Sequence, residues 1–358
     1  MTKRSGSVKH RIKLFLRDAW ARTLFHTGLE RVVDALMPRR LTILAGHCVT
    51  APSNARLPKD MKIAGEKLER MMSWFARRYD VTTVGEGLRR LEGTKGRSLL
   101  ALSMDDGYRD NATDLLPLLA RVGVPATVYL ESQPLEARRV NWSHKFFWIL
   151  ARVGEKEFVR SFGARCGDAP TVTRLEALQA EGSATTYQLK RVLKYDAPPA
   201  ARNRAIEEVF AALGGDERAL CDELYMTWAD VRKLADGGVE LGGHTVNHEI
   251  LSRLDAAGAE REVREGREAI DRRMDVASAS FAFPFGRRWD YDAKSKEAVK
   301  KAGFASASTT HAGTNRKGCD AYELRRVMID EDAELFLVAA EACGGFDLLR
   351  AIGIDLSS

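Results

Sequence analysis

Two short motifs, far apart in the chain, carry side chains that could do chemistry together. The first is Ser-Met-Asp-Asp-Gly at 103–107, which ends an apolar run, and the second is His244-Thr-Val-Asn-His248. Desolvation and mutual repulsion both oppose ionisation of two adjacent carboxyl groups beside a buried strand. A divalent cation relieves both effects, and two histidines can supply ligands for it. The pattern indicates a metal-dependent hydrolase in which one acid binds metal and its neighbour acts as a base.

The combination of the two motifs is much stronger than either motif alone. Asp-Asp-Gly triplets are common in turns, and a histidine pair at this spacing is more often structural. Gly242 and Gly243 precede His244 and allow close backbone approach at a strand end. One carboxylate oxygen and two imidazole nitrogens form a three-ligand set that leaves a position for water. We therefore expect one divalent metal ion, zinc before others, which would activate water and polarise a carbonyl.

The elements that must position these motifs follow an alternating pattern. Short apolar strand candidates alternate with amphipathic helical patterns, which predicts a mainly parallel sheet of the α/β class. With about seven strands, a distorted (β/α)7-type barrel is the expected closure. Asp105, Asp106 and His244 each follow a strand candidate directly, as catalytic groups do in such barrels. The expected strands are 41–47, 98–104, 126–131, 239–243, 279–283, 304–308 and 326–329.

The domain organisation follows from where this alternation stops. Residues 135–224 interrupt it with a mostly helical pattern. We expect an N-terminal segment at 1–40 and one barrel domain at 41–358, with the helical insert about 135–224, since 358 residues suit a single embellished domain. The insert would project from the catalytic face. A cap or substrate-binding role and a purely structural role both stay open.

Positive charge is concentrated at the start of the chain. The whole chain carries a net charge of +6. Residues 1–40 hold three Lys and seven Arg against three acidic residues, a net +7, so the remainder is close to neutral. The basic cluster has no recognisable nucleic-acid-binding motif, and we expect no nucleic-acid partner.

The same segment has a helical repeat. Ile12, Leu16, Trp20 and Leu24 recur every four residues, as on one face of a helix. Two interpretations stay open: a helix packed on its own domain, or a basic amphipathic helix in peripheral contact with an anionic membrane surface. Charged residues interrupt the segment as they would not in a secretory signal, and no apolar run reaches bilayer length. The five scattered cysteines favour a reducing compartment. We expect a cytoplasmic protein, peripheral at the inner membrane surface if the helix binds lipid.

These motifs resemble those of the polysaccharide deacetylases, carbohydrate esterase family four, with the NodB-homology domain. The resemblance covers about 41–134 and 225–330 and implies zinc or a similar ion. It implies Asp105 as the general base and Asp106, His244 and His248 as metal ligands. The strongest matches are Ser103-Met-Asp-Asp-Gly-Tyr-Arg-Asp-Asn111, Trp228 through His248-Glu-Ile-Leu251, and Phe281-Ala-Phe-Pro-Phe-Gly-Arg-Arg288.

The resemblance also implies groups that would stabilise the reaction. The backbone N–H of Phe285, after Pro284, is expected to donate to the oxyanion. His311 is the candidate general acid, although its Thr-Thr-His-Ala-Gly context departs from the Leu-x-His pattern of the family. An exposed loop histidine is the alternative interpretation. His47, at the end of the first expected strand, lines the pocket or caps the strand.

A second departure concerns an arginine near the base. Many family members have Arg two residues before the proline, where this chain has Ala282, which leaves Arg287 or Arg288 to supply the charge. The leading hypothesis is an N-deacetylase of an N-acetylated sugar in intracellular glycan or polysaccharide biosynthesis, on a nucleotide-linked or lipid-linked sugar. The alternatives are an amide or imide hydrolase or an O-deacetylase of another small substrate, and a non-catalytic glycan-binding pseudoenzyme.

Overall fold

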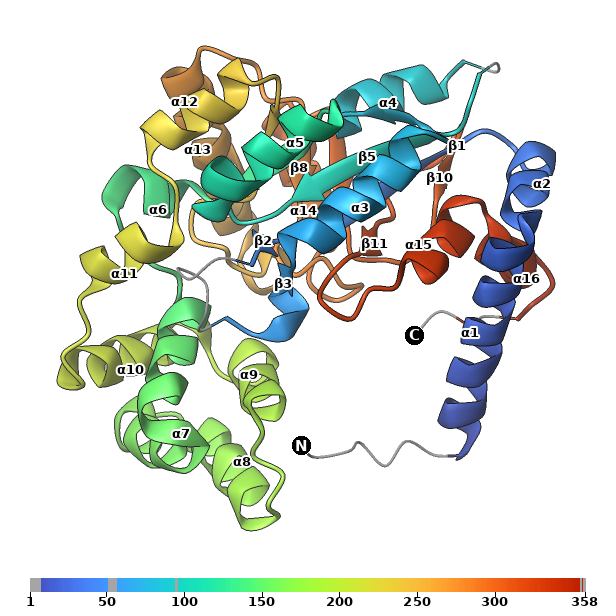
Figure 1. Ribbon diagram of the computed structural model, residues 1–358. Helices are drawn as coiled ribbons and strands as arrows, with labels where there is room; N and C mark the ends of the chain where they lie inside the picture. Colours follow the sequence, from blue (N-terminus) through green and yellow to red (C-terminus); the bar gives the residue numbers. More distant parts are fainter. Residues whose placement is uncertain (1–7, 51–56, 94–95, 355, 357–358) are drawn as a thin grey trace. The chain divides into compact units, whose positions relative to one another are not determined.

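The computed structural model describes residues 8–50, 57–93, 96–354 and 356 (Figure 1). The chain divides into two compact units. The first, here called the sheet unit, comprises 1–51, 59–132 and 226–358. The second, the helical unit, comprises 52–58 and 133–225.

One nine-stranded sheet forms the centre of the sheet unit. Its strands follow the path β10-β1-β5-β6-β7-β8-β9, with β11 paired to β1 and β4 paired to β5. A separate two-stranded ribbon joins β2 to β3. The strands are β1 (Arg40–Gly46), β2 (Cys48–Val49), β3 (Lys62–Ile63), β4 (Asp80–Thr82), β5 (Leu99–Met104), β6 (Thr127–Leu130), β7 (Glu240–Gly243), β8 (Ser280–Ala282), β9 (Ser306–Ser308), β10 (Asn315–Arg316) and β11 (Val327–Met328).

All seven expected strands are present, and β1, β5, β6, β7, β8 and β9 run parallel. Every residue of β1 and β5 is buried, as in a parallel sheet covered on both faces. The sheet curls: Leu324 bonds to β9 through its backbone, and β11 then pairs with β1. The α/β class with a curled sheet therefore holds, whereas complete closure as a (β/α)7 barrel stays a prediction. The sequence patterns did not predict β4 or β10.

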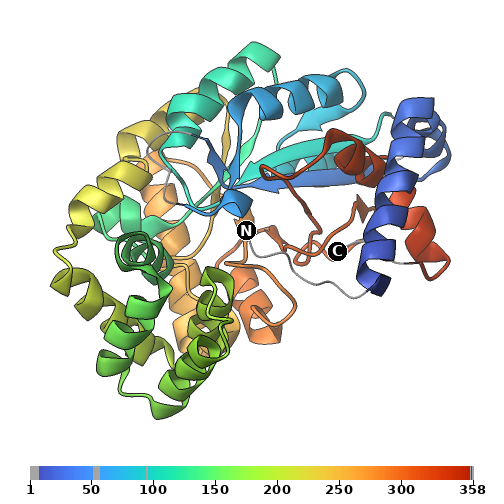
Figure 2. The ribbon, with the colours of Figure 1, turned by 60° about the horizontal axis from the view of Figure 1, so that its bottom comes forward.

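Helices of the sheet unit pack over the sheet (Figures 1 and 2). The helix α4 packs on β1 and β5, and α13 packs on β7 and α14. The helices of the sheet unit are α1 (Val8–Thr27), α2 (Leu29–Leu36), α3 (Gly65–Ala76), α4 (Val84–Leu91), α5 (Leu116–Val122), α12 (Trp228–Asp236), α13 (Ala256–Met274), α14 (Ala293–Lys301), α15 (Leu335–Ala342) and α16 (Gly345–Ala351), with short turns at η2 (Lys59–Met61), η3 (Asn111–Leu115) and η4 (Leu251–Arg253).

The helical unit is built of helices around a buried aromatic centre. Its longest helix, α7, is interrupted at Gly154, whose φ of 73° lies in the left-handed region. Phe146 and Phe158 stack edge to face from the two sides of that break. The helices are α7 (Trp142–Cys166), α8 (Ala169–Ala180), α9 (Thr186–Tyr195), α10 (Pro199–Ala212) and α11 (Glu217–Leu224), preceded by α6 (Ser132–Ala137), which begins at the last residue of the sheet unit.

Candidate active site

Neighbouring parallel strands place the candidate side chains at one edge of the sheet. Asp105 and Asp106 follow β5, His244 follows β7, and Phe285 comes three residues after β8. The strands β5, β6, β7 and β8 are consecutive neighbours and parallel. Their carboxyl ends therefore lie at the same edge, which brings together residues almost 180 positions apart in the sequence.

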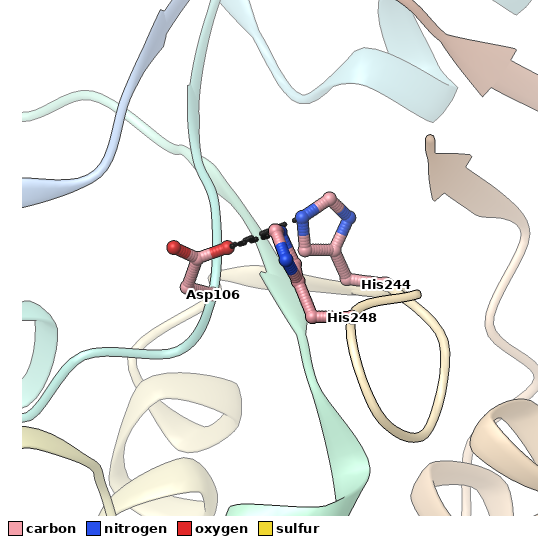
Figure 3. Close-up of side chains that lie close together, drawn as sticks. All are labelled: Asp106, His244 and His248. Atoms are coloured by element: carbon pink, nitrogen blue, oxygen red, sulfur yellow. Dashed lines mark ion pairs between the residues drawn. The ribbon is translucent and has the colours of Figure 1, made fainter. Parts of the chain in front are cut away.

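Asp106, His244 and His248 converge on one point (Figure 3). Asp106 Oδ1 lies 3.2 Å from His244 Nε2 and 3.3 Å from His248 Nε2. One potential ligand atom from each residue lies within 4.8 Å of the other two, and all three residues are buried. This is the geometry of three ligands around a space for a small cation.

The hydrogen bond of His244 fixes which ring nitrogen faces that space. His244 Nδ1 lies 2.7 Å from the carbonyl oxygen of Ala282 and therefore donates its proton there. The lone pair of Nε2 is then directed toward Asp106. Metal-binding histidines usually have such a backbone or carboxylate partner on the second nitrogen. Ala282 thus positions a ligand through its backbone, although its side chain cannot replace an arginine.

The electrostatics of Asp106 also fit a cation. Its Oδ1 is buried and, within the described residues, makes no hydrogen bond of normal geometry. Burial opposes ionisation of this carboxyl, but the charge of His248 and close contacts from both imidazoles outweigh that effect and hold its pKa well below the usual range. A carboxylate that stays ionised between two ring nitrogens is a suitable donor for a divalent metal ion.

The backbone of the loop between the two histidines is strained, and a side chain of a neighbouring helix holds it. Thr245 and His248 have φ values of 68° and 56°, a region that β-branched and bulky residues rarely adopt. Glu262 on α13 accepts hydrogen bonds from the backbone N–H groups of Val246 and Asn247, at 3.1 and 2.8 Å. These bonds clamp the loop and place the second histidine.

Arg326 is the residue that reasoning from sequence missed. Its guanidinium forms two parallel hydrogen bonds to the Asp105 carboxylate, at 2.7 and 2.8 Å, and both side chains are buried. Its Nε donates to the carbonyl oxygen of Thr309 at 2.7 Å, which fixes the orientation of the fork. Such bidentate pairs combine charge with geometric specificity.

This arginine determines the state of Asp105. Burial opposes ionisation of the carboxyl, but the charge and hydrogen bonds of Arg326 prevail and lower its pKa. Arg287 and Arg288, the residues considered from sequence, are both exposed. The charge that Ala282 cannot supply comes instead from the segment that leads into β11.

Phe285 lies beside the metal-ligand set. Its φ of 61° is left-handed, and Gly286 follows with the same φ. A Cβ on Gly286 would approach Thr310 N to 2.9 Å, so this tight turn requires glycine. The Phe285 ring packs edge-on against the ring of His248, with centroids 4.6 Å apart. The turn and this ring contact hold Phe285 beside a metal-ligand candidate, and its role as an oxyanion donor stays a prediction.

The other two candidate histidines, His47 and His311, occupy different surroundings. His47 is half-buried after β1, and it is a charge neighbour of both Asp105 and Asp106. The His311 ring is half-buried at 5.9 Å from the Tyr291 ring, and burial followed by the nearby Arg325 charge lowers its pKa. Within the described residues, no hydrogen bond or ion pair links His311 to the two acids. The general-acid role of His311 stays a prediction.

Comparison with known proteins relates this geometry to a family. Residues 171–307 match the profile of the family described as polysaccharide deacetylase, a range that includes His244, His248 and Phe285 but begins after the two acids. The chain is 19% identical over 295 residues to YxkH of Bacillus subtilis (strain 168), which bears the name of that family, and the match covers 82% of this chain and 72% of YxkH.

Solved structures share the fold. The Streptococcus pyogenes deacetylase PplD, determined in complex with acetate, superposes with a TM-score of 0.54 at 14% identity and covers 86% of this chain and 99% of its own. IcaB from Ammonifex degensii gives a TM-score of 0.53 at 15% identity, over 85% and 97% of the two chains. Residues 171–307 therefore resemble the polysaccharide deacetylase family, and the chain shares the fold of these solved structures.

Proposed function

We propose that this protein is a divalent-metal-dependent N-deacetylase acting on an N-acetylated sugar. The observation that carries the proposal is the division of labour between two adjacent buried acids. Asp105 pairs with Arg326, whereas Asp106 lies between His244 and His248. Each carboxylate thus has its own partner, which suits one for proton transfer and the other for metal binding.

The residues of this chain would act as follows. Asp106, His244 and His248 would hold the ion, which when bound supplies Lewis-acid activation of water and of the substrate carbonyl. Asp105 would accept the proton of the attacking water, because Arg326 keeps its carboxyl ionised and oriented. The Phe285 backbone N–H would donate to the oxyanion of the tetrahedral intermediate.

The proton needed by the departing amine would come from a histidine. His311 is the residue proposed from sequence, and His47 is a charge neighbour of both acids. Replacing each histidine by glutamine distinguishes the two. The variant that has lost the general acid should fail on an amide substrate but retain more activity on an activated acetate ester. An activated ester has a leaving group that needs no protonation.

The family and its relatives support the substrate class. PplD was determined with acetate, the acid that deacetylation releases. An N-acetylated glycan or its sugar precursor is therefore the proposed substrate here. The expected cytoplasmic location stays a prediction, and cell fractionation would test it. The amide or imide hydrolase and O-deacetylase alternatives use the same site and are separated by substrate alone.

The test is acetate release from a panel of N-acetylated sugars, O-acetylated sugars and small cyclic imides, measured together with metal content. Asp105→Asn should lower turnover by at least about a hundredfold while metal stays bound. Asp106→Asn should instead lose metal. Asp236→Asn, at an exposed position, is the matched control and should retain both properties.

The outcomes distinguish the hypotheses. Release from O-acetylated sugars or imides alone would replace the proposed reaction with one of the alternatives. No turnover on any class, with metal bound, would favour a binding protein. Substantial activity in Asp105→Asn would show that the assigned roles are wrong or reversed.

A further inference from the structure

The fully buried side chains of the N-terminal helix α1 lie in its second half. Ala21 and Leu24 are fully or almost fully buried against Phe336, Ala340 and Phe346 of α15 and α16. Trp20 Nε1 donates to the carbonyl oxygen of Gly345 at 3.2 Å. Figures 1 and 2 both show α1 alongside these C-terminal helices. This part of α1 belongs to the core of the sheet unit.

The first half of the same helix presents large apolar side chains to solvent. Ile12, Phe15 and Leu16 are 52%, 71% and 50% exposed. Their spacing of three and four residues places them on one side of the helix. At about 100° per residue, Ile12 lies opposite Ala21, so the exposed side is distinct from the packed side.

The next helix adds a second exposed apolar strip. Leu29, Val32 and Leu36 on α2 are 44%, 52% and 81% exposed. Six of the thirteen exposed large hydrophobic side chains among the described residues therefore come from α1 and α2, two helices of 20 and 8 residues. This concentration of exposed apolar side chains makes the two helices the candidate interaction surface of the described chain. We name these six residues the N-terminal apolar face.

Positive charge accompanies this face. Arg11 and Lys13 flank Ile12, and the structure gives neither an ion pair within the described residues. The nearby acid Asp18 is neutralised by Arg17 at 2.8 Å. A second copy of the chain would bring its own Arg11 and Lys13 to the same surface, and like charges would oppose that contact. An anionic surface instead complements the face in both apolarity and charge.

No helix in the described part of the chain has the length and apolarity to span a bilayer. A helix that lies in the plane of the interface needs an exposed apolar strip beside basic residues. The helix α1 has both, and α2 adds its own apolar strip. We propose that the N-terminal apolar face docks the protein reversibly onto a membrane surface rich in anionic lipid. Phe15, Leu16 and Leu36 would enter the headgroup region, while Arg11 and Lys13 pair with lipid phosphates.

The experiment uses the full chain, because removal of residues 1–40 would also delete Ala21, Leu24 and the buried Arg40 from the core. Co-sedimentation is measured with vesicles of phosphatidylcholine alone and with added phosphatidylserine, at low and high salt. The wild type should bind the anionic vesicles and lose affinity as salt rises, since each basic residue near the surface contributes about fivefold.

Two double variants separate the contributions. Phe15→Ser with Leu16→Ser should weaken partitioning more than about tenfold through lost apolar contact. Arg11→Glu with Lys13→Glu should weaken it at least about tenfold, and most strongly at low salt. Val276→Ser is the apolar control, and Arg174→Glu with Arg218→Glu matches the charge change at exposed positions elsewhere. Circular dichroism of each variant verifies the fold.

Several outcomes overturn the proposal. Failure of the wild type to sediment with anionic vesicles does so directly. Equal binding by wild type and both double variants shows that another surface carries any lipid contact. A dimer that the Phe15 and Leu16 substitutions dissociate, without vesicle binding, assigns the face to a second copy. None of these results depends on deacetylase activity, so the proposed function is tested separately.

Discussion

At the scale of single residues, the two adjacent acids are stabilised by separate cationic partners. Arg326 neutralises Asp105 through a buried bidentate pair, and the imidazoles of His244 and His248 contact Asp106. Neighbouring carboxylates without such partners would repel each other and resist ionisation. The arrangement therefore keeps both acids charged while leaving them chemically distinct.

Replacement of Arg326 by glutamine should alter the pH dependence of catalysis. The pKa of Asp105 is lowered in the folded protein because the guanidinium outweighs burial. Without the guanidinium, the largest effect that opposes burial is lost and the pKa rises, so the base becomes protonated at pH values where it is now ionised. The acidic limb of kcat/KM should move to higher pH, and activity at neutral pH should fall at least about tenfold.

Two further variants make this measurement specific. Arg326→Lys keeps the charge and should restore part of the acidic limb, whereas a purely structural role would not depend on charge. Arg288→Gln removes an exposed arginine of the same region and should leave the profile unchanged. An unaltered acidic limb in Arg326→Gln would show that this residue does not set the pKa of the base.

The site residues differ in how readily the sequence predicts them. Asp105, Asp106, His244 and His248 stand in compact motifs at strand ends, so their proximity could be predicted. Arg326 stands 221 residues from its partner, and no local motif marks it. One signal was available: an arginine at the start of an apolar strand candidate is costly to bury unless an acid pairs with it.

At the scale of elements, the loop between β7 and η4 has to hold two ligands in a strained backbone. Four of the six non-glycine residues with positive φ in the described chain belong to the candidate site: Asp106, Thr245, His248 and Phe285. Such conformations persist where the surroundings determine them. Here the surroundings are supplied by α13, through Glu262 and through Gly266, where a Cβ would meet the Thr245 backbone at 3.0 Å.

Removal of the Glu262 carboxylate should therefore weaken metal binding without touching a ligand. Glu262→Ala leaves the backbone N–H groups of Val246 and Asn247 without their acceptor, so the loop loses its fixed shape. Loss of such supporting groups typically lowers metal affinity by about 10- to 100-fold. Competition with a chelator measures the affinity. Glu265→Ala, at an exposed position on the same helix, should behave as wild type, and equal affinity in all three proteins would contradict the clamp.

Strand prediction succeeded where the sequence has an apolar run. The seven apolar strands were found in order, whereas β4 and β10 are mostly polar and form no such run, although β8, β9 and β11 are equally short. The four-residue repeat of α1 was misleading for a geometric reason. Each step of four residues rotates the stripe by about 40°, so Ile12 and Leu24 differ by about 120°. The stripe therefore starts in solvent and ends in the core.

At the scale of the whole molecule, the N-terminal and C-terminal helices of the sheet unit pack together. Arg40, the first residue of β1, is fully buried, and its Nε donates to the carbonyl oxygen of Ala342 at the end of α15 at 2.8 Å. Its guanidinium also pairs with Asp34 of α2. The N-terminal helices are thus tied through β1 to the C-terminal helices, and one segment serves both the core and the exposed apolar face.

Matched leucine truncations on α1 should reveal these two roles. Leu24 is 1% exposed and packs against α15 and α16, so Leu24→Ala should lower the free energy of unfolding by about 2–5 kcal/mol. Leu16→Ala removes the same atoms from a side chain that is 50% exposed, and the change should stay within about 0.5 kcal/mol. Urea denaturation measures both, and metal content should be unchanged in each folded variant because neither residue contacts the site. Equal destabilisation would mean that the first half of α1 is packed as firmly as the second, and the N-terminal apolar face would then be part of the core rather than free to meet a membrane.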